Sequence, residues 1–304
     1  MWELIRNEKI VRRGGTAREY HSHILFEQNL NTQLRKNGFC LVKNFFSSDE
    51  VQELRSLIKQ KKHKNQDVYL SINESGLGKI LFSKKYFDLL KKIIGEDLVY
   101  FKDSHLLIDS DKQKTGTFHI DARNDNEDPS KSEYKVWRIG MYLQDHKNYS
   151  GGIKMIYASH TKLLLSSFRK IYHILLKIFR KNLKISFKSF LPPLRYFNIP
   201  SEAGDLIIWN GRTHHCGRFR RLKFLKNFNM HPFFDRVLPD FLFAKENEDR
   251  LVIFQNWCLQ DKASQDYIDY RLSQVEFKDY WENNKILEKD FPAQEFKNAN
   301  ITLY

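Results

Sequence analysis

The spacing of hydrophobic residues changes twice along the chain. Residues 84–95 (KKYFDLLKKIIG) place apolar side chains at helical spacing and end at Gly95, a residue typical of helix C-termini. From Leu98 the apolar runs are short, rich in β-branched and aromatic residues, and separated by Gly, Asn or Asp, as in LVYF, HLLI, VWRIGMYL, GIKMIYAS and DLIIWN. After Pro239 the pattern becomes helical again. The pattern therefore predicts a β core with helices before and after it.

A short strand and a helix are predicted ahead of this core. Residues 39–42 (FCLV) form a strand-like run, and Ser47 and Glu50 have the spacing of a capping box, which marks the start of a helix. The apolar face of that helix would consist of Val51, Leu54, Leu57 and Ile58.

Several short strands in series favour an antiparallel sandwich or barrel over a βαβ fold. The 304 residues, 41% of them hydrophobic, suffice for one large core and contain no internal repeat or low-complexity tract. We predict one domain over residues 1–304, mainly β with added helices. The N-terminal strand and helices would occupy 1–97, the β core 98–235 and a C-terminal helical part 236–304.

The net charge of +14 is unevenly distributed. No Asp or Glu lies between Asp145 and Glu202, although that interval carries eleven Lys or Arg residues, and a second acid-free run extends from Leu206 to Phe234. Such asymmetry favours an anionic partner: membrane lipid, nucleic acid, or a phosphorylated or acidic substrate. The alternative is an excess of solvated lysines without a partner.

Residues 161–190 predict an amphipathic helix whose charges are all basic. Its apolar side chains recur at steps of three and four residues, opposite a face of Lys and Arg. We expect a lid or a contact with anionic membrane beside the pocket, or else an ordinary surface helix packed on the sheet. The aromatic residues lie on the apolar side, which disfavours nucleic-acid binding.

The cysteine content and the N-terminus predict a cytoplasmic protein, peripheral to the membrane if residues 161–190 contact lipid. Cys40, Cys216 and Cys258 are widely spaced without a CxxC pair, which disfavours a disulfide framework and a cysteine zinc site. The first residues lack the apolar core of a signal peptide, and no apolar run has membrane-spanning length.

His119-Ile120-Asp121 is the candidate metal motif. Residues i and i+2 of a strand project to the same side, so the imidazole and the carboxylate can face one point. A histidine from the His214-His215 pair would complete a set of two His and one carboxylate, which suits iron(II) and leaves coordination positions open. Adjacent strand residues face opposite sides, so the register of the strand decides which of the two histidines faces the metal.

Further motifs follow in order. Gly151-Gly152 opens a strand that leads to Ala158-Ser159-His160, Ala203-Gly204-Asp205 precedes another strand, and Arg212-x-x-His215 precedes Gly217. With the His-x-Asp motif, they make the sequence resemble the phytanoyl-CoA dioxygenase family over residues 38–231. The resemblance implies a double-stranded β-helix (jelly-roll, cupin-like) core, Fe(II), 2-oxoglutarate and oxygenation of an unactivated carbon.

The resemblance also assigns roles to residues. It implies that His119 and Asp121 bind the metal together with His215, which has the family's Arg-x-x-His spacing. It places His160 at the substrate pocket together with Arg212 and His214. Arg212 could instead be a structural ion-pair partner, and His214 could support the metal ligands or face solvent. The presence of Asp121 implies hydroxylation or a related oxidation, and not halogenation.

The sequence departs from the family at the 2-oxoglutarate anchor. Members usually carry an arginine eleven residues beyond the distal histidine, and this chain has Lys226 there. Lysine pairs with a carboxylate as a point charge, with less geometric specificity than arginine. Arg220 or Arg221 could serve instead if the strand contains a bulge, and Lys112, with Lys114 beside it, is a candidate second contact.

The predicted function is an Fe(II)- and 2-oxoglutarate-dependent dioxygenase acting on an anionic small molecule or a lipid-linked anionic substrate. Two alternatives stay open at this point. One is a non-catalytic jelly-roll binder of an anionic surface, and the other is a zinc-dependent cupin-type enzyme with the same ligands.

Overall fold

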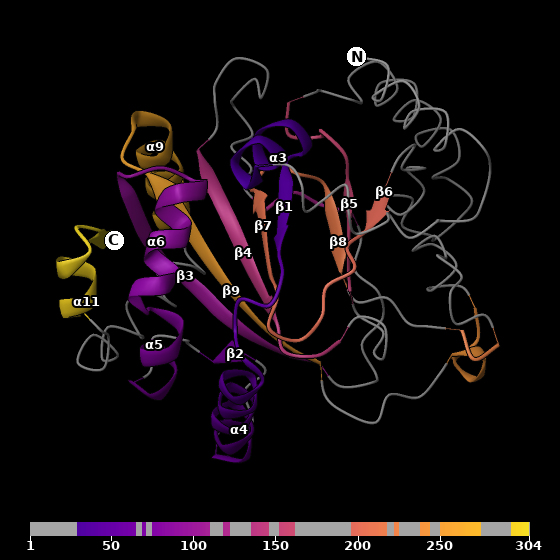
Figure 1. Ribbon diagram of the computed structural model, residues 1–304. Helices are drawn as coiled ribbons and strands as arrows, with labels where there is room; N and C mark the ends of the chain where they lie inside the picture. The colour runs from indigo at the N-terminus through magenta and orange to yellow at the C-terminus, as the bar shows by residue number, and fades with distance from the viewer. Residues whose placement is uncertain are drawn as a thin grey trace.

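Two β-sheets facing each other form the centre of the protein (Figure 1). The computed structural model describes residues 29–64, 69–70, 75–109, 118–121, 135–145, 152–161, 196–217, 222–224, 238–243, 250–274 and 293–303. Within these residues the larger sheet has the order β1 (Phe39–Val42), β7 (Leu206–Asn210), β4 (Val136–Tyr142), β9 (Arg250–Leu259), β3 (Leu98–Asp109) and β10 (Thr302–Leu303), with β2 (Tyr69–Leu70) also on β3. The smaller sheet has the order β6 (Tyr196–Asn198), β5 (Ile153–Ile156) and β8 (His215–Gly217).

The chain alternates between the two sheets. It passes from β4 in the larger sheet to β5 and β6 in the smaller one, returns in β7, crosses again in β8 and ends the core in β9. Strands β7, β4, β9 and β3 are antiparallel neighbours, and β5 pairs with both β6 and β8. This arrangement is a double-stranded β-helix, so the predicted fold class is confirmed.

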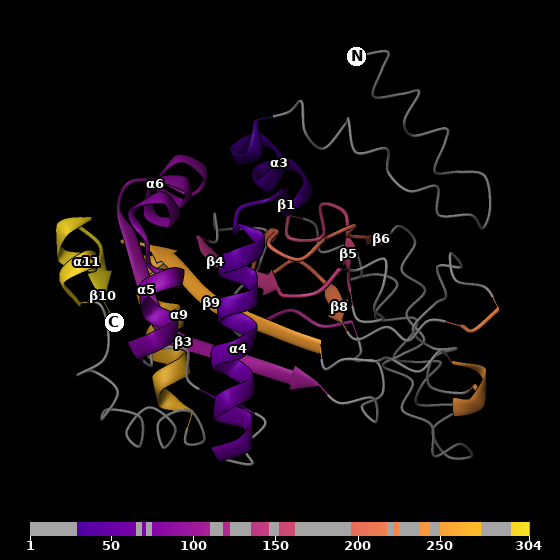
Figure 2. The same ribbon diagram turned by 60° about the horizontal axis from the view of Figure 1, so that its bottom comes forward.

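Helices cover the outer face of the larger sheet (Figure 2). The described helices are α3 (Leu30–Asn37), α4 (Ser48–Lys64), α5 (Ser75–Leu81), α6 (Lys84–Ile93), α9 (Lys262–Ser273) and α11 (Ala293–Asn298), with a 3-10 turn η2 (Asp240–Leu242). Apolar side chains of α4, α5, α6 and α11 form one cluster with the outer face of β4, β7 and β9. Helix α9 packs on the opposite side of β3, β4 and β9. None of the described helices has the length and apolar content needed to cross a membrane.

Alternation along the central strands separates the helix-facing core from the barrel interior. On β4, Ile139 and Met141 belong to the helix-facing cluster, whereas Tyr142 belongs to the cluster between the two sheets. Because successive side chains point to opposite faces of a strand, Arg138 and Gly140 share the interior face with Tyr142. The same alternation places Arg250, Val252, Phe254 and Asn256 of β9 toward the interior.

Two local predictions can be compared with the structure. The capping box is present, since Ser47 N donates to Glu50 Oε2 at 2.7 Å and Glu50 N donates to Ser47 Oγ at 3.2 Å. The β core, however, reaches beyond residue 235, because β9 (Arg250–Leu259) lies in the part expected to be helical. Eight of the ten β9 residues are buried, so the strand lacks the polar–apolar alternation that marks a half-exposed strand.

Candidate metal centre

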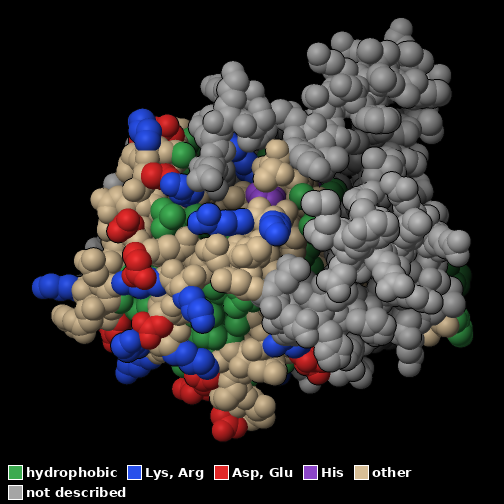
Figure 3. Space-filling model, turned by 45° about the horizontal axis from the view of Figure 1, so that its top comes forward, with side chains coloured by type: hydrophobic (Ala, Val, Ile, Leu, Met, Phe, Trp, Pro, Cys, Tyr) green, Lys and Arg blue, Asp and Glu red, His purple; other side chains and the backbone are tan. Residues whose placement is uncertain are grey.

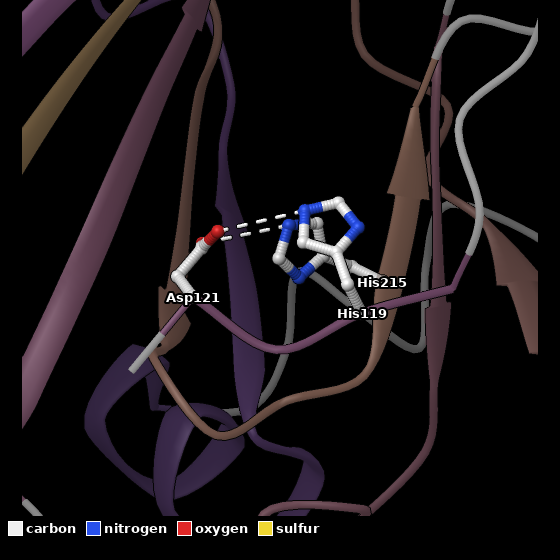
Figure 4. Close-up of side chains that lie close together, drawn as sticks. All are labelled: His119, Asp121 and His215. Atoms are coloured by element: carbon white, nitrogen blue, oxygen red, sulfur yellow. Dashed lines mark ion pairs between the residues drawn. The ribbon is translucent and has the colours of Figure 1, made fainter. Parts of the chain in front are cut away.

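His119, Asp121 and His215 come together at the mouth of the barrel (Figure 4). One possible ligand atom from each lies within 4.8 Å of the others. Asp121 Oδ2 is 3.4 Å from His215 Nε2, and Asp121 Oδ1 is 3.6 Å from His119 Nε2. The two imidazole centroids are 4.4 Å apart. In the described part of the chain, this is the group of His, Cys, Asp or Glu side chains that could hold a metal ion.

Main-chain hydrogen bonds align the three residues. His119 N donates to His215 O and His215 N donates to His119 O, both at 2.9 Å, so the His-x-Asp segment runs antiparallel to β8. Asp121 N donates to Gly211 O at 3.0 Å. Because His119 and Asp121 are two residues apart on extended backbone, their side chains project to one side, as the motif predicted.

The structure places His215, and not His214, in the cluster. The side chain of His215 is 6% exposed. The main chain of His214 is bonded to other residues. Its N donates to Ser159 Oγ at 2.9 Å, and its carbonyl oxygen accepts from Ile156 N at 2.9 Å. The register of β8 against β5 therefore decides which histidine of the pair faces the barrel interior.

The ring of His215 is held in one tautomer. Its Nδ1 lies 3.0 Å from the carbonyl oxygen of Thr213. A carbonyl oxygen only accepts, so Nδ1 carries the proton and Nε2 presents its lone pair toward Asp121 and His119. An imidazole oriented in this way is ready to bind a metal through Nε2.

The charge states of Asp121 and His215 also suit a cation. The pKa of Asp121 is lowered from 3.8 to about 2. Burial alone would raise this pKa, but the charges of His215 and Arg138 lower it by more, and His119 and the indole hydrogen bond of Trp209 act in the same direction. Burial lowers the pKa of His215 from 6.5 to about 4, against the opposing effect of Asp121. At neutral pH the carboxylate is thus ionised and His215 is neutral, the forms that metals bind.

Trp209 takes part in the site as well as in the core. It is 1% exposed, as expected for a core residue, and its Nε1 donates to Asp121 Oδ2 at 3.1 Å. The sequence carried no sign of this contact, because the two residues are on different strands and distant in the chain.

The other predicted site residues are not part of the group that could hold a metal, or lie outside the described residues. His160 Nε2 is 2.9 Å from Arg35 O, at the end of α3, and a Cβ on Gly38 (φ +83°) would come within 2.5 Å of His160 Nδ1. This packing connects the turn after β5 to the α3–β1 junction. Arg212 is 6% exposed, and its N donates to Asn210 Oδ1 at 2.9 Å. The remaining predicted positions lie outside the described residues: Lys112, Lys114, Arg220, Arg221, Lys226 and most of 161–190.

Arg250 is a basic residue of the barrel that sequence reasoning missed. It begins β9, is 4% exposed, and its Cζ lies 5.5 Å from the ring centroid of Tyr142. A Cβ on Gly217 would lie 3.3 Å from Arg250 Nη2, so the guanidinium occupies the space beside β8. Gly217 follows His215 by two residues, about 6.6 Å along the same face of the strand. The sequence signal for Arg250 was an arginine at the start of the apolar run LVIF. The family spacing of eleven residues beyond His215 stops at Lys226 and does not reach it.

Comparisons with known proteins agree with this architecture. No protein-family model matches the chain, and no curated protein matches its sequence. Among solved structures, the α-ketoglutarate-dependent epimerase SnoN from nogalamycin biosynthesis has a TM-score of 0.50 and 15% identity, covering 75% of this chain and 79% of SnoN. HygX from Streptomyces hygroscopicus, solved with nickel and 2-oxoglutarate, has a TM-score of 0.51 and 13% identity, covering 77% of this chain and 88% of HygX.

A third similar structure is the α-ketoglutarate-dependent carbocyclase SnoK from nogalamycin biosynthesis. It has a TM-score of 0.50 and 13% identity, covering 78% of this chain and 85% of SnoK. At these identities the likeness establishes the fold. The chain has the double-stranded β-helix fold of the non-heme 2-oxoglutarate-dependent enzymes, with a His-x-Asp…His cluster consistent with their facial triad.

Proposed function

We propose that the protein is an Fe(II)- and 2-oxoglutarate-dependent oxygenase. The observation that carries the proposal is the convergence of His119, Asp121 and His215 at the barrel mouth. Two imidazoles and one carboxylate are the donor set typical of non-heme iron(II) oxygenases. The neighbouring thiol of Cys216 is fully buried on the other face of β8, so the cluster lacks the soft ligand that favours zinc or copper(I).

At neutral pH, Asp121 and His215 already have the protonation states that iron(II) binds. His119, Asp121 and His215 would hold the metal, with Asp121 ionised and His215 Nε2 unprotonated at neutral pH. When bound, iron(II) with 2-oxoglutarate and dioxygen supplies the oxidation of a C–H bond. The protein's own part is to hold the ligands in position, to admit the co-substrate beside them and to limit the access of water.

The charge of the barrel interior suits a dianionic co-substrate. On the interior face of β4 and β9, the described charged residues are Arg138 and Arg250, and Asp121 is the carboxylate beside them. Figure 3 shows one outer face of the molecule, where a histidine side chain has Lys and Arg side chains nearest to it. A molecule with two carboxylates would offset this positive charge.

Arg250 is the residue we propose for the distal carboxylate of 2-oxoglutarate. Its planar guanidinium can bind a carboxylate bidentately, and burial removes the competition of water. The guanidinium lies beside Gly217, which is two residues, about 6.6 Å, from His215 along β8. Arg250 therefore supplies the anchoring arginine that the position of Lys226 lacks.

The substrate is proposed only by class. The acid-free intervals of the sequence and the arginines of the barrel interior, Arg138 and Arg250, support an anionic substrate whose unactivated carbon is hydroxylated. A lipid-linked or membrane-associated substrate stays a prediction that depends on residues 161–190.

An anaerobic titration tests the proposed function. Iron(II) and then 2-oxoglutarate are added to metal-free protein while the visible metal-to-ligand charge-transfer band is recorded. We expect the band in the wild type and in His214→Ala, and its loss in His119→Ala. His214→Ala is the matched control because it removes the neighbouring imidazole that is not part of the cluster. A folded, iron-loaded wild type without the band would contradict the proposal, and binding of zinc without a band would favour the zinc-dependent alternative.

A further inference from the structure

Side chains from two adjacent strands meet the same oxygen atom of Asp121. Trp209 on β7 donates its indole N–H to Asp121 Oδ2 at 3.1 Å. Arg138 on β4 places its Nε 3.7 Å from the same atom. The register of the larger sheet pairs Arg138 with Trp209 directly, so the two side chains reach Asp121 side by side. His215 Nε2 also lies 3.4 Å from Oδ2, whereas Oδ1 faces His119 Nε2 at 3.6 Å.

The guanidinium of Arg138 is itself held in place. Its Nη1 donates to Asn256 Oδ1 at 3.3 Å, and its Cζ lies 5.2 Å from the ring centroid of Phe254. Both partners are on β9, where Asn256 is the residue opposite Arg138 in the register. The Arg138 side chain is only 12% exposed, so its charge interacts with Asp121 in a medium that screens weakly.

Trp209 is held by the shape of the neighbouring strand. A Cβ on Gly140 would lie 3.0 Å from Trp209 Cζ3 and 3.2 Å from Cη2. At these distances a side chain at position 140 would push the indole by a few tenths of an ångström. Gly140 therefore permits the orientation in which the indole N–H reaches Asp121.

We infer that Arg138 and Trp209 are positioning residues that hold Asp121 as a one-oxygen metal ligand. A hydrogen bond and a positive charge on Oδ2 lower its electron density and restrain the carboxylate, which leaves Oδ1 as the better metal-binding oxygen. A carboxylate that binds through one oxygen keeps a further coordination position open, as a bidentate 2-oxo acid and dioxygen together require. This inference rests on the proposed function and adds to it the residues that define how Asp121 binds.

Cobalt(II) binding to the metal-free full-length protein tests the inference, with the dissociation constant and the d–d absorption spectrum as readouts. Trp209→Phe keeps an aromatic ring and removes the N–H donor. Arg138→Met removes the charge at similar length, and Arg138→Lys restores a cation. We expect about 10- to 100-fold weaker Co(II) binding in Trp209→Phe and Arg138→Met, partial recovery in Arg138→Lys, and a changed spectrum.

Trp137→Phe is the matched control. Trp137 is next to Arg138 on β4 but belongs to the helix-facing cluster, so its loss tests the cost of a smaller ring without touching Asp121. We expect Co(II) binding and the spectrum of Trp137→Phe to equal those of the wild type. If Trp209→Phe does not fold, the comparison of Arg138→Met with Arg138→Lys decides.

Two outcomes separate the inference from the proposed function. Wild-type affinity and an unchanged spectrum in both Trp209→Phe and Arg138→Met, in a protein that binds Co(II) and 2-oxoglutarate, would overturn the inference and leave the function intact. A folded wild type that binds neither metal nor 2-oxoglutarate would overturn both.

Discussion

His119 and His215 exchange two main-chain hydrogen bonds, each of 2.9 Å, so the segment that carries the first histidine is tied directly to the strand that carries the second. The imidazoles are brought to a centroid distance of 4.4 Å by this backbone pairing. Asp121 is held beside them by a hydrogen bond from its main-chain N to Gly211 O. Backbone pairing therefore brings the three ligand residues together.

Replacing His119 and replacing His215 should lower the free energy of unfolding by different amounts. The side chain of His119 is 51% exposed, so His119→Ala should change the free energy of unfolding of the metal-free protein by no more than about 0.5 kcal/mol. His215 is buried and bonded to Thr213 O, so His215→Ala should cost roughly 2 kcal/mol. Urea unfolding measures both values, and both variants should lose Co(II) binding. Equal costs would show that the burial difference has no energetic consequence.

Acid should destabilise the metal-free protein through His215. The pKa of its imidazole is lowered by burial from 6.5 to about 4, so the unfolded chain binds more protons than the folded protein between these values. Stability is then fully present above about pH 6.5 and declines as the pH falls toward 4, by roughly 3 kcal/mol. Asp121, with its pKa lowered to about 2, adds a further loss below pH 3.8. Urea unfolding at several pH values should show a smaller decline in His215→Gln, and an equal decline would assign the effect to other groups.

Gly140→Ala should weaken metal binding without altering a ligand. The new Cβ would lie 3.0 Å from Trp209 Cζ3, so the indole must shift by a few tenths of an ångström, and we expect this shift to weaken its bond to Asp121. We expect a loss of about 1–3 kcal/mol in unfolding free energy and weaker Co(II) binding. Gly76→Ala in helix α5 is the control. Its new Cβ would meet only the flexible end of the Leu57 side chain, at 3.3 Å. Unchanged Co(II) affinity in Gly140→Ala would separate Trp209 from the metal site.

Arg250→Gln should separate co-substrate binding from metal binding. It removes the charge of the buried guanidinium and keeps a polar side chain beside Gly217. We expect the dissociation constant for 2-oxoglutarate to rise at least about tenfold, as calorimetry on Co(II)-loaded protein would measure, because a charge-assisted bidentate contact is lost. Affinity for Co(II) alone should be unchanged. The comparison variant is Lys226→Ala: if it loses 2-oxoglutarate binding and Arg250→Gln does not, the anchor is Lys226.

Several features of the protein follow from the sequence alone. The change from helical to strand spacing near Leu98 predicts where the β core begins, and β3 begins there. The capping box at Ser47 and Glu50 forms as its spacing requires. The two-residue spacing of His119 and Asp121 makes their side chains converge wherever the backbone is extended. These are local properties, decided by periods of two or 3.6 residues and by bonds between near neighbours.

The remaining features depend on contacts between distant strands. Pairing with β5 and with the His119 segment selects His215 over His214, because adjacent residues on a strand face opposite ways. The central strand β9 is buried on both faces, so its sequence does not alternate between polar and apolar residues. Arg250 could not be found by counting eleven residues from His215, because it lies on a later strand. Arg138 and Trp209 meet at Asp121 only because β4 and β7 are neighbours in the sheet. Sequence spacing thus determined which residues could act together, and the sheet register decided which of them do.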